Sequence, residues 1–174
     1  LKIKNKLIYG FHLFFRILKL ENILILISKT FSLNQSKILP QNLMYPNNDE
    51  IMIKRKEIFF IINRSDFTQW QIYADYPELH YEAFLETKRG GNVIDVGSNI
   101  GSFSLVAANH LNKKKSNYKV YSFEPFNEIY NKLLIKININ NYLKDNLVTE
   151  KIALSDKIGE KLFFEVIQNN LGAN

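Results

Sequence analysis

Short apolar segments of two kinds alternate through the C-terminal half of the chain. Residues 93–96 and 120–123 are compact apolar runs of the sort found in buried strands, and 147–154 is predicted to be a third strand. Between these strands, residues 102–111 and 127–141 place apolar side chains at helical spacing. Strands that alternate with helices of this length predict an α/β fold, in which right-handed crossovers connect a parallel sheet with helices on both of its faces.

The pattern is less regular in the N-terminal half. Residues 1–50 are predicted to be a helical extension followed by a linker. The linker is placed at 32–50, because this segment contains proline and asparagine and its apolar residues follow no regular spacing. Residues 51–91 are predicted to hold a hairpin at 51–62 and then helices that precede the core, with Asp66 as the cap of the first. The α/β core would then follow.

The last part of the chain, residues 92–174, is predicted to be half of a Rossmann-like domain. Turn residues at 155–159 precede a return strand at 161–167, which would form a hairpin with the third strand. Because the first residue is Leu1 and residues 169–174 stop in a predicted loop, we expect a fragment whose sheet is truncated after the third strand and the following hairpin.

The stretch 7–31 is as apolar as a membrane-spanning segment, but charged and polar residues interrupt it. No uncharged run in it approaches the ~20 residues that cross a bilayer. The residues that interrupt it are His12, Arg16, Lys19 and Glu21. Two interpretations remain open: a helix packed on its own domain or on a partner, and an amphipathic helix in peripheral contact with an anionic membrane through residues 1–31.

Composition narrows the functional classes. With 46% apolar residues the chain can bury one sizeable core. The net charge of +6 is the excess of 23 cationic residues over 17 acidic ones, and the cationic residues are 19 Lys and only 4 Arg. Nucleic-acid recognition favours arginine, so we expect no nucleic-acid partner. There is no cysteine, and the three histidines lack the spacing of metal ligands, so we expect no metal site. These features fit a protein of the reducing cytoplasm.

A glycine-bearing turn after the first core strand is the main candidate for chemistry. The segment runs from Asp95 through Gly97 and Asn99 to Gly101. It lacks the spacing and the lysine of a phosphate-binding P-loop, and Asn99 stands where a dinucleotide fingerprint has its middle glycine. Asp95 would repel a pyrophosphate but would attract the ammonium and sulfonium charges of S-adenosylmethionine. The turn therefore favours a ligand with a cationic amino-acid half.

A second carboxylate follows the next strand. Glu124 would lie at the same edge of the sheet as the glycine turn, where its two oxygens could accept both hydroxyls of a ribose. An acidic residue beside Pro125 at the start of a helix also has a purely structural interpretation, because it interacts favourably with the helix dipole. Both interpretations of Glu124 remain open at this point.

Taken together, three segments, 93–105, 123–125 and 153–156, resemble the FkbM-type family of S-adenosylmethionine-dependent methyltransferases. The resemblance implies a class I methyltransferase fold that transfers a methyl group to a hydroxyl of a sugar, a glycan or another small metabolite. It also implies that Ala153 lies near the adenine. The candidate cofactor-binding residues are Asp95, Gly97, Ser98, Asn99, Gly101, Glu124, Pro125 and Ala153. The acidic fourth-strand motif that the family carries beside the transferred methyl is not among these residues.

No catalytic residue is assigned. His80, Tyr81 and Glu82 precede the first core strand and could reach the pocket, but packing is the more frequent role of such residues in a helix. Two alternatives to a methyltransferase remain: a Rossmann domain of an NAD-binding oxidoreductase, and a non-catalytic, membrane-associated module that retains the fold.

Overall fold

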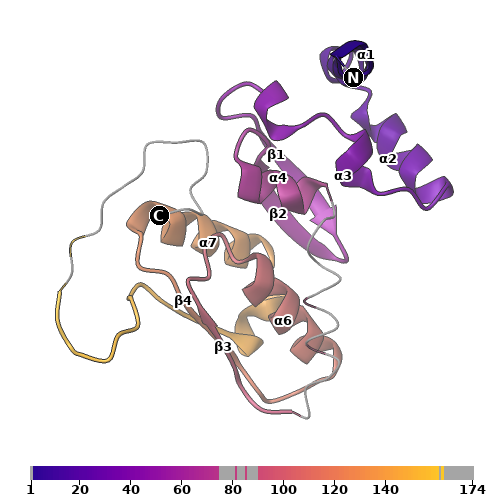
Figure 1. Cartoon of the computed structure of the whole chain (residues 1–174). Helices are drawn as coiled ribbons and strands as arrows, with labels where there is room; N and C mark the ends of the chain where they lie inside the picture. Colours follow the sequence, from indigo (N-terminus) through magenta and orange to yellow (C-terminus); the bar gives the residue numbers. More distant parts are fainter. Residues whose placement is uncertain (1, 75–80, 82–84, 86–89, 161, 163–174) are drawn as a thin grey trace. The chain divides into compact units, whose positions relative to one another are not determined.

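The protein has an α/β fold, and its described residues form one two-stranded and one three-stranded sheet (Figure 1). The computed structural model describes residues 2–74, 81, 85, 90–160 and 162. Its contacts divide the chain into two units. We call residues 1–51 and 62–76 the N-terminal unit, and residues 52–61 and 77–174 the C-terminal unit. In the part that the structure describes, no helix has the length and apolar character needed to cross a membrane.

Two helices begin the N-terminal unit where the sequence predicts one apolar helical stretch. Helix α1 spans Lys2–Ile17 and α2 spans Glu21–Thr30. Between them Lys19 adopts a left-handed conformation with φ of 54°, and the Leu20 N–H donates to the Phe15 carbonyl at 2.9 Å. This is the usual geometry of a helix C-terminus, although glycine is the residue that favours it. The break is therefore set by backbone geometry that the apolar pattern does not reveal.

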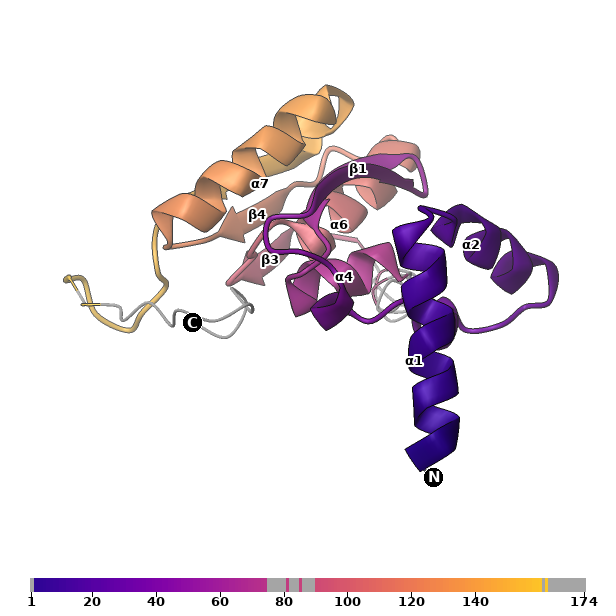
Figure 2. The same ribbon diagram turned by 90° about the horizontal axis from the view of Figure 1, so that it is seen from above.

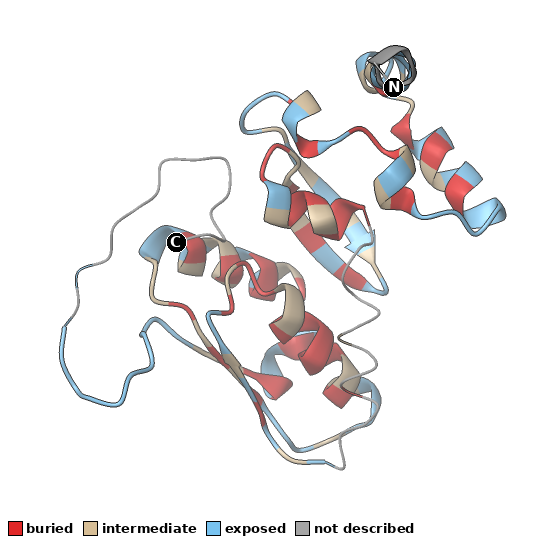
Figure 3. Ribbon diagram, viewed as in Figure 1, coloured by how far each residue is buried: buried red, intermediate tan, exposed pale blue. Residues whose placement is uncertain are grey.

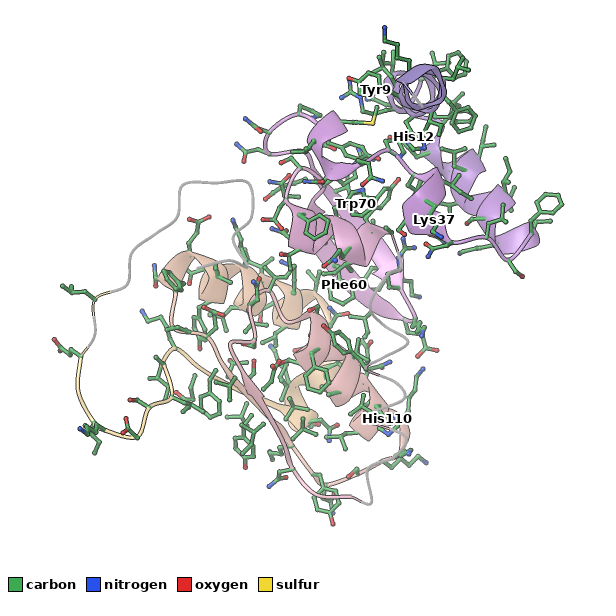
Figure 4. The ribbon with its side chains drawn as sticks, in the orientation of Figure 1. Tyr9, His12, Lys37, Phe60, Trp70 and His110 are labelled. Carbon is green, nitrogen blue, oxygen red and sulfur yellow. The ribbon has the colours of Figure 1, made fainter. Side chains whose placement is uncertain are left out.

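Residues 32–50, predicted to be a linker, are packed. They form the helical turns α3 (Gln35–Ile38) and η1 (Asn42–Met44), and both Leu39 and Tyr45 are buried. The Pro40 carbonyl accepts a hydrogen bond of 2.9 Å from the indole of Trp70, a side chain that Figure 4 labels. Buried apolar residues and the hydrogen bond from the Trp70 indole thus stabilise a segment whose apolar residues follow no helical or strand spacing.

Helix α4 (Phe67–Tyr73) confirms the predicted cap. The Asp66 carboxylate accepts from the Gln69 N–H at 2.9 Å, and Trp70 and Ile72 are buried. An acceptor at this position satisfies one of the N–H groups that a helix leaves unpaired at its start.

A partly buried cation, Arg64, organises the same unit. Arg64 donates to the Asp49 carboxylate at 2.7 Å and to the Glu21 carboxylate at 3.3 Å. Its guanidinium lies 4.2 Å from the centroid of the Tyr45 ring and 5.4 Å from that of Tyr73. The planar group pairs with carboxylates at its edge and with aromatic rings at its face, which a lysine could not do.

The predicted hairpin is confirmed as β1 (Glu50–Arg55) and β2 (Ile58–Asn63). Lys56 and Glu57 at its turn both have positive φ, as a two-residue hairpin turn requires. Phe59 is bonded to the buried Asn140 of the same unit, whose side chain accepts from the Phe59 N–H at 2.8 Å and donates to its carbonyl at 2.7 Å. One amide group therefore satisfies both backbone groups of a strand residue.

The three core strands are confirmed as a parallel sheet in the order β3-β4-β5. Strands β3 (Val93–Val96), β4 (Val120–Phe123) and β5 (Leu147–Glu150) are in register, with Val120 between Val93 and Leu147. The third strand ends at Glu150 and is shorter than predicted. Residues 151–160 beyond it contain no helix or strand and are exposed (Figure 3). The predicted helix at 78–87 and return strand at 161–167 fall largely outside the described residues.

Helices α6 (Ser102–Lys113) and α7 (Asn127–Ile139) connect these strands, and η2 (Asn141–Asn146) leads into β5. In α7 the predicted apolar positions Ile129, Leu133 and Ile137 are buried. Figure 3 shows that nearly every turn of α6 is buried as well.

The expectation of helices on both faces of the sheet is not met in the described part of the chain. Figure 1 shows α6 and α7 on the same side of the strands. On the other side Ile94 and Val96 are 65% and 62% exposed, whereas Val93 is 4% exposed. The strands advance in one direction, so two right-handed crossovers place both helices on one face; a helix on the second face needs a reversal of strand order.

Arg64→Met is expected to lower the free energy of unfolding by about 3–5 kcal/mol, because the carboxylates of Glu21 and Asp49 would keep their charges without the guanidinium. Their side chains are only 7% and 20% exposed. Urea unfolding followed by the fluorescence of Trp70, the only tryptophan in the sequence, measures the change. Lys132→Met is the control, since it breaks the more exposed pair with Glu128 and should cost about 0.5 kcal/mol or less. Equal losses in the two variants would refute a central role for Arg64.

Candidate functional site

The glycine turn is joined to the carboxyl end of the neighbouring strand. The N–H groups of Gly97 and Ser98 donate to the Phe123 carbonyl at 2.9 and 3.0 Å. Gly97, Asn99 and Gly101 have φ values of 74°, 50° and 86°. The Asn99 side chain accepts from the Ile100 N–H at 2.6 Å, which helps to hold the left-handed conformation of a residue other than glycine. The turn is thus a compact loop at the carboxyl edge of the sheet.

The two glycines meet different surroundings. A Cβ on Gly101 would overlap the Leu133 Cδ1, so the absence of a side chain lets α6 begin against α7. A Cβ on Gly97 would have no atom within 4 Å. Close packing therefore explains Gly101, and open space beside the backbone remains at Gly97. Such space is what a ligand that approaches the backbone requires.

Glu124 bridges the two turns at this edge. The residue is 4% exposed, and its carboxylate accepts from the Asn99 N–H at 2.8 Å and from the Phe126 N–H at 3.0 Å. Its own N–H donates to the Glu150 carbonyl at 3.1 Å. The carboxylate therefore fixes the glycine turn to the start of α7, a structural role that goes beyond the interaction with a helix dipole considered from the sequence.

Asp95 belongs to a buried polar chain that the sequence did not reveal. Its carboxylate accepts from the Ser104 Oγ at 2.5 Å, and this hydroxyl lies 2.9 Å from that of Ser122. Both serines are fully buried, Ser104 on α6 and Ser122 on β4. The sequence signal for this polar chain was the presence of two hydroxyl residues, Ser104 and Ser122, among apolar neighbours that are buried.

Burial raises the pKa of Asp95, and the nearby charge of Glu124 raises it further, while hydrogen bonds from Ser104 oppose the shift. The charged group that acts on Asp95 is thus a second carboxylate. Glu150 adds a third acidic residue at the end of β5. The edge of the sheet is therefore acidic, and a positive charge placed there would lower the cost of ionising Asp95.

Ser98 is a buried polar residue in the middle of the turn. It is 4% exposed, and in the described part of the chain its Oγ has no hydrogen-bond partner. A hydroxyl left in this state costs free energy unless a partner is supplied. Ser98 is therefore a predicted cofactor residue whose hydroxyl can still take a hydrogen-bond partner.

Pro125, Ala153 and Tyr81 are the remaining sequence candidates in the described part of the chain. Pro125 is half-buried and precedes Phe126, the N-cap of α7. Ala153 is exposed, three residues beyond the end of β5. The Tyr81 ring packs edge-to-face on Phe103 of α6 with centroids 5.1 Å apart, which gives it a packing contact. His80 and Glu82 lie outside the described residues.

No protein-family model matches the chain, and no curated protein matches it. Among solved structures it is similar to the "putative transferase PH0793" of Pyrococcus horikoshii, with 14% sequence identity and a TM-score of 0.46. The similarity covers 76% of this chain and 47% of that protein, so the chain spans about half the length of the structure it matches. What the chain does is to be inferred from the chemistry of its turn and strand ends.

Gly101→Ala is expected to cost more stability than Gly97→Ala, by about 1 kcal/mol or more, because only the first substitution also overlaps Leu133. Both positions have similar positive φ, so backbone strain is matched between the two variants. Adding Leu133→Ala to Gly101→Ala should cost less than the sum of the single losses, with a coupling of about 0.5–3 kcal/mol. Additive losses in urea unfolding would show that the contact with Leu133 does not limit this position.

Glu124→Gln is expected to lower the free energy of unfolding by about 1.5–3 kcal/mol, because the amide nitrogen would face the backbone N–H of either Asn99 or Phe126. Glu128→Gln is the matched control, since Glu128 lies in the first turn of α7 and is exposed. Thermal and urea unfolding of both variants give the comparison. If Glu124→Gln is no less stable than the control, the carboxylate does not hold the two turns together.

Proposed function

We propose that the turn from Asp95 to Gly101 binds S-adenosylmethionine and that the chain is the cofactor-binding part of a methyltransferase. One observation carries the proposal: two carboxylates, Asp95 and Glu124, lie at adjoining strand ends around a glycine turn, and the charge of Glu124 raises the cost of ionising Asp95. A ligand with positive charge in its amino-acid half offsets that cost, whereas a pyrophosphate increases it.

The residues present fit this cofactor in three respects. The space beside Gly97 admits a ligand against the backbone. The Ser98 hydroxyl lacks a partner within the described residues and could bond a polar group of the ligand. Each Glu124 oxygen accepts one N–H, and a carboxylate oxygen can accept a second hydrogen bond, so the two hydroxyls of a ribose could complete its set.

The protein's part in methyl transfer would be binding, orientation and the exclusion of water. When bound, S-adenosylmethionine supplies a methyl carbon that is already activated by its positive sulfur. Asp95 provides the negative field for the amino-acid half, and Glu124 fixes the sugar relative to the turn. We further propose that the acceptor is a hydroxyl of a sugar, a glycan or another small metabolite, whose proton must be removed during transfer.

The same geometry disfavours the NAD-binding alternative. Asn99 stands at the position where a dinucleotide fingerprint requires glycine, and its side chain is committed to the turn through the Ile100 N–H. The two carboxylates would also face the charges of the pyrophosphate. A non-catalytic module that retains the fold would bind neither cofactor, and the titration below distinguishes the three.

S-adenosylmethionine or its demethylated product is expected to raise the melting temperature of the protein, whereas NAD is expected to leave it unchanged. Only a ligand that binds the native state stabilises it, by about 2.7 kcal/mol when the ligand is present at a hundred times its dissociation constant. A thermal-shift titration with all three compounds measures this. Stabilisation by NAD alone would favour an oxidoreductase, and no response to any compound would favour the non-catalytic module.

Asp95→Asn tests the electrostatic argument within the same titration. The affinity for S-adenosylmethionine should fall as the pH is lowered through the raised pKa of Asp95, because protonation removes the attracting charge. The asparagine variant should bind more weakly and show little of this pH dependence. Because the pKa of Asp95 is raised in the folded protein, the stability that Asp95 contributes at low pH is lost as the pH rises. The neutral asparagine should therefore not destabilise the protein at pH 7. An unchanged pH profile in the variant would assign the effect to another group.

A further inference from the structure

Helix α1 presents a continuous apolar stripe to solvent. Leu7, Phe11 and Phe14 of α1, and Leu18 directly after its end, follow the spacing of one helical face and are 70%, 46%, 55% and 50% exposed. Four large apolar side chains on one face form a patch of the kind that marks an interaction site rather than an ordinary surface. Figure 2 shows α1 from the side, with its N-terminal half extending beyond α2.

The opposite side of α1 is already in contact with its own unit. His12 is 6% exposed and hydrogen-bonds the backbone at Ile38, and burial lowers the pKa of its imidazole. Figure 4 shows His12 on the side of α1 that faces α3, where Lys37 is labelled. The rotation of the helix is therefore fixed by packing, and the apolar stripe remains directed outward.

The charges around this stripe have a single sign. Residues 1–20 contain no Asp or Glu and carry five cationic residues, Lys2, Lys4, Lys6, Arg16 and Lys19. The first acidic residue, Glu21, is buried and paired with Arg64. A purely cationic helix complements an anionic surface, whereas two copies of it brought face to face would repel.

We propose that α1 binds the surface of an anionic lipid bilayer, with the apolar stripe at the boundary between headgroups and acyl chains and with Lys6 and Lys19 among the headgroups. Helices of this kind lie in the plane of the interface. Sixteen residues of helix are about 24 Å long, which is too short to span the hydrocarbon core, so the contact is peripheral. This proposal is independent of the proposed cofactor.

Sedimentation of the full chain with vesicles tests the proposal. Vesicles of phosphatidylcholine with phosphatidylglycerol should bind the protein, and vesicles of phosphatidylcholine alone should bind it about tenfold or more weakly, because the cations contribute to binding. The double substitution Leu7→Gln and Phe14→Gln should reduce binding to the anionic vesicles by about tenfold or more, since it removes apolar area. Leu43→Gln, at a position that is 81% exposed in the same unit, should leave binding unchanged.

Lys6→Gln combined with Lys19→Gln should weaken anionic binding while the Trp70 fluorescence shows an intact fold. Three outcomes would overturn the proposal: no binding by the folded protein, equal binding to neutral and anionic vesicles, or equal loss in the Leu43→Gln control. Light scattering measures the oligomeric state and so tests the alternative that a second copy of the chain binds the stripe. Self-association that the Leu7→Gln and Phe14→Gln substitutions abolish, without vesicle binding, would assign the stripe to a dimer interface.

Discussion

The carboxylate of Glu124 connects the two turns from which the candidate site is built. One oxygen accepts from the glycine turn after β3 and the other from the start of α7, so a single buried group links the two turns. The backbone hydrogen bonds around the site depend on this arrangement, because the glycine turn can donate to the Phe123 carbonyl only while it lies at the end of β4. Burying such a charge is costly, and here two N–H groups take the place of water.

Acidic residues have opposite roles in the two units of the chain. In the N-terminal unit, Glu21 and Asp49 are neutralised by Arg64 and serve stability. In the C-terminal unit, Asp95 and Glu124 are held by hydroxyl and N–H groups, which satisfy their hydrogen bonds but leave their net charge in place. The charge that remains at the edge of the sheet is available to a ligand. The distinction lies in the partners, because the residue types are the same.

Much of the C-terminal fold could be predicted because period and turn chemistry agree there: the apolar strands, the spacing of α7 and the glycine turn are all where the sequence places them. Elsewhere the deciding interactions are not periodic. Lys19 takes a left-handed conformation that composition does not signal, and residues 32–50 pack through single contacts such as that between Pro40 and Trp70. The link from Asp95 to Ser104 and Ser122 joins three elements, so it emerges only from their packing.

The order of the strands bears on how the chain folds. Val93 pairs with Val120 and Val120 pairs with Leu147, so each strand joins its neighbour after the same interval of 27 residues, 93 to 120 and 120 to 147. Each of these strands pairs with the one before it in the sequence, and each connecting helix packs on the pair of strands that it joins. Loop-closure entropy is therefore lost in two small steps. During synthesis on the ribosome, the sheet can grow outward from β3 in the order in which its strands emerge.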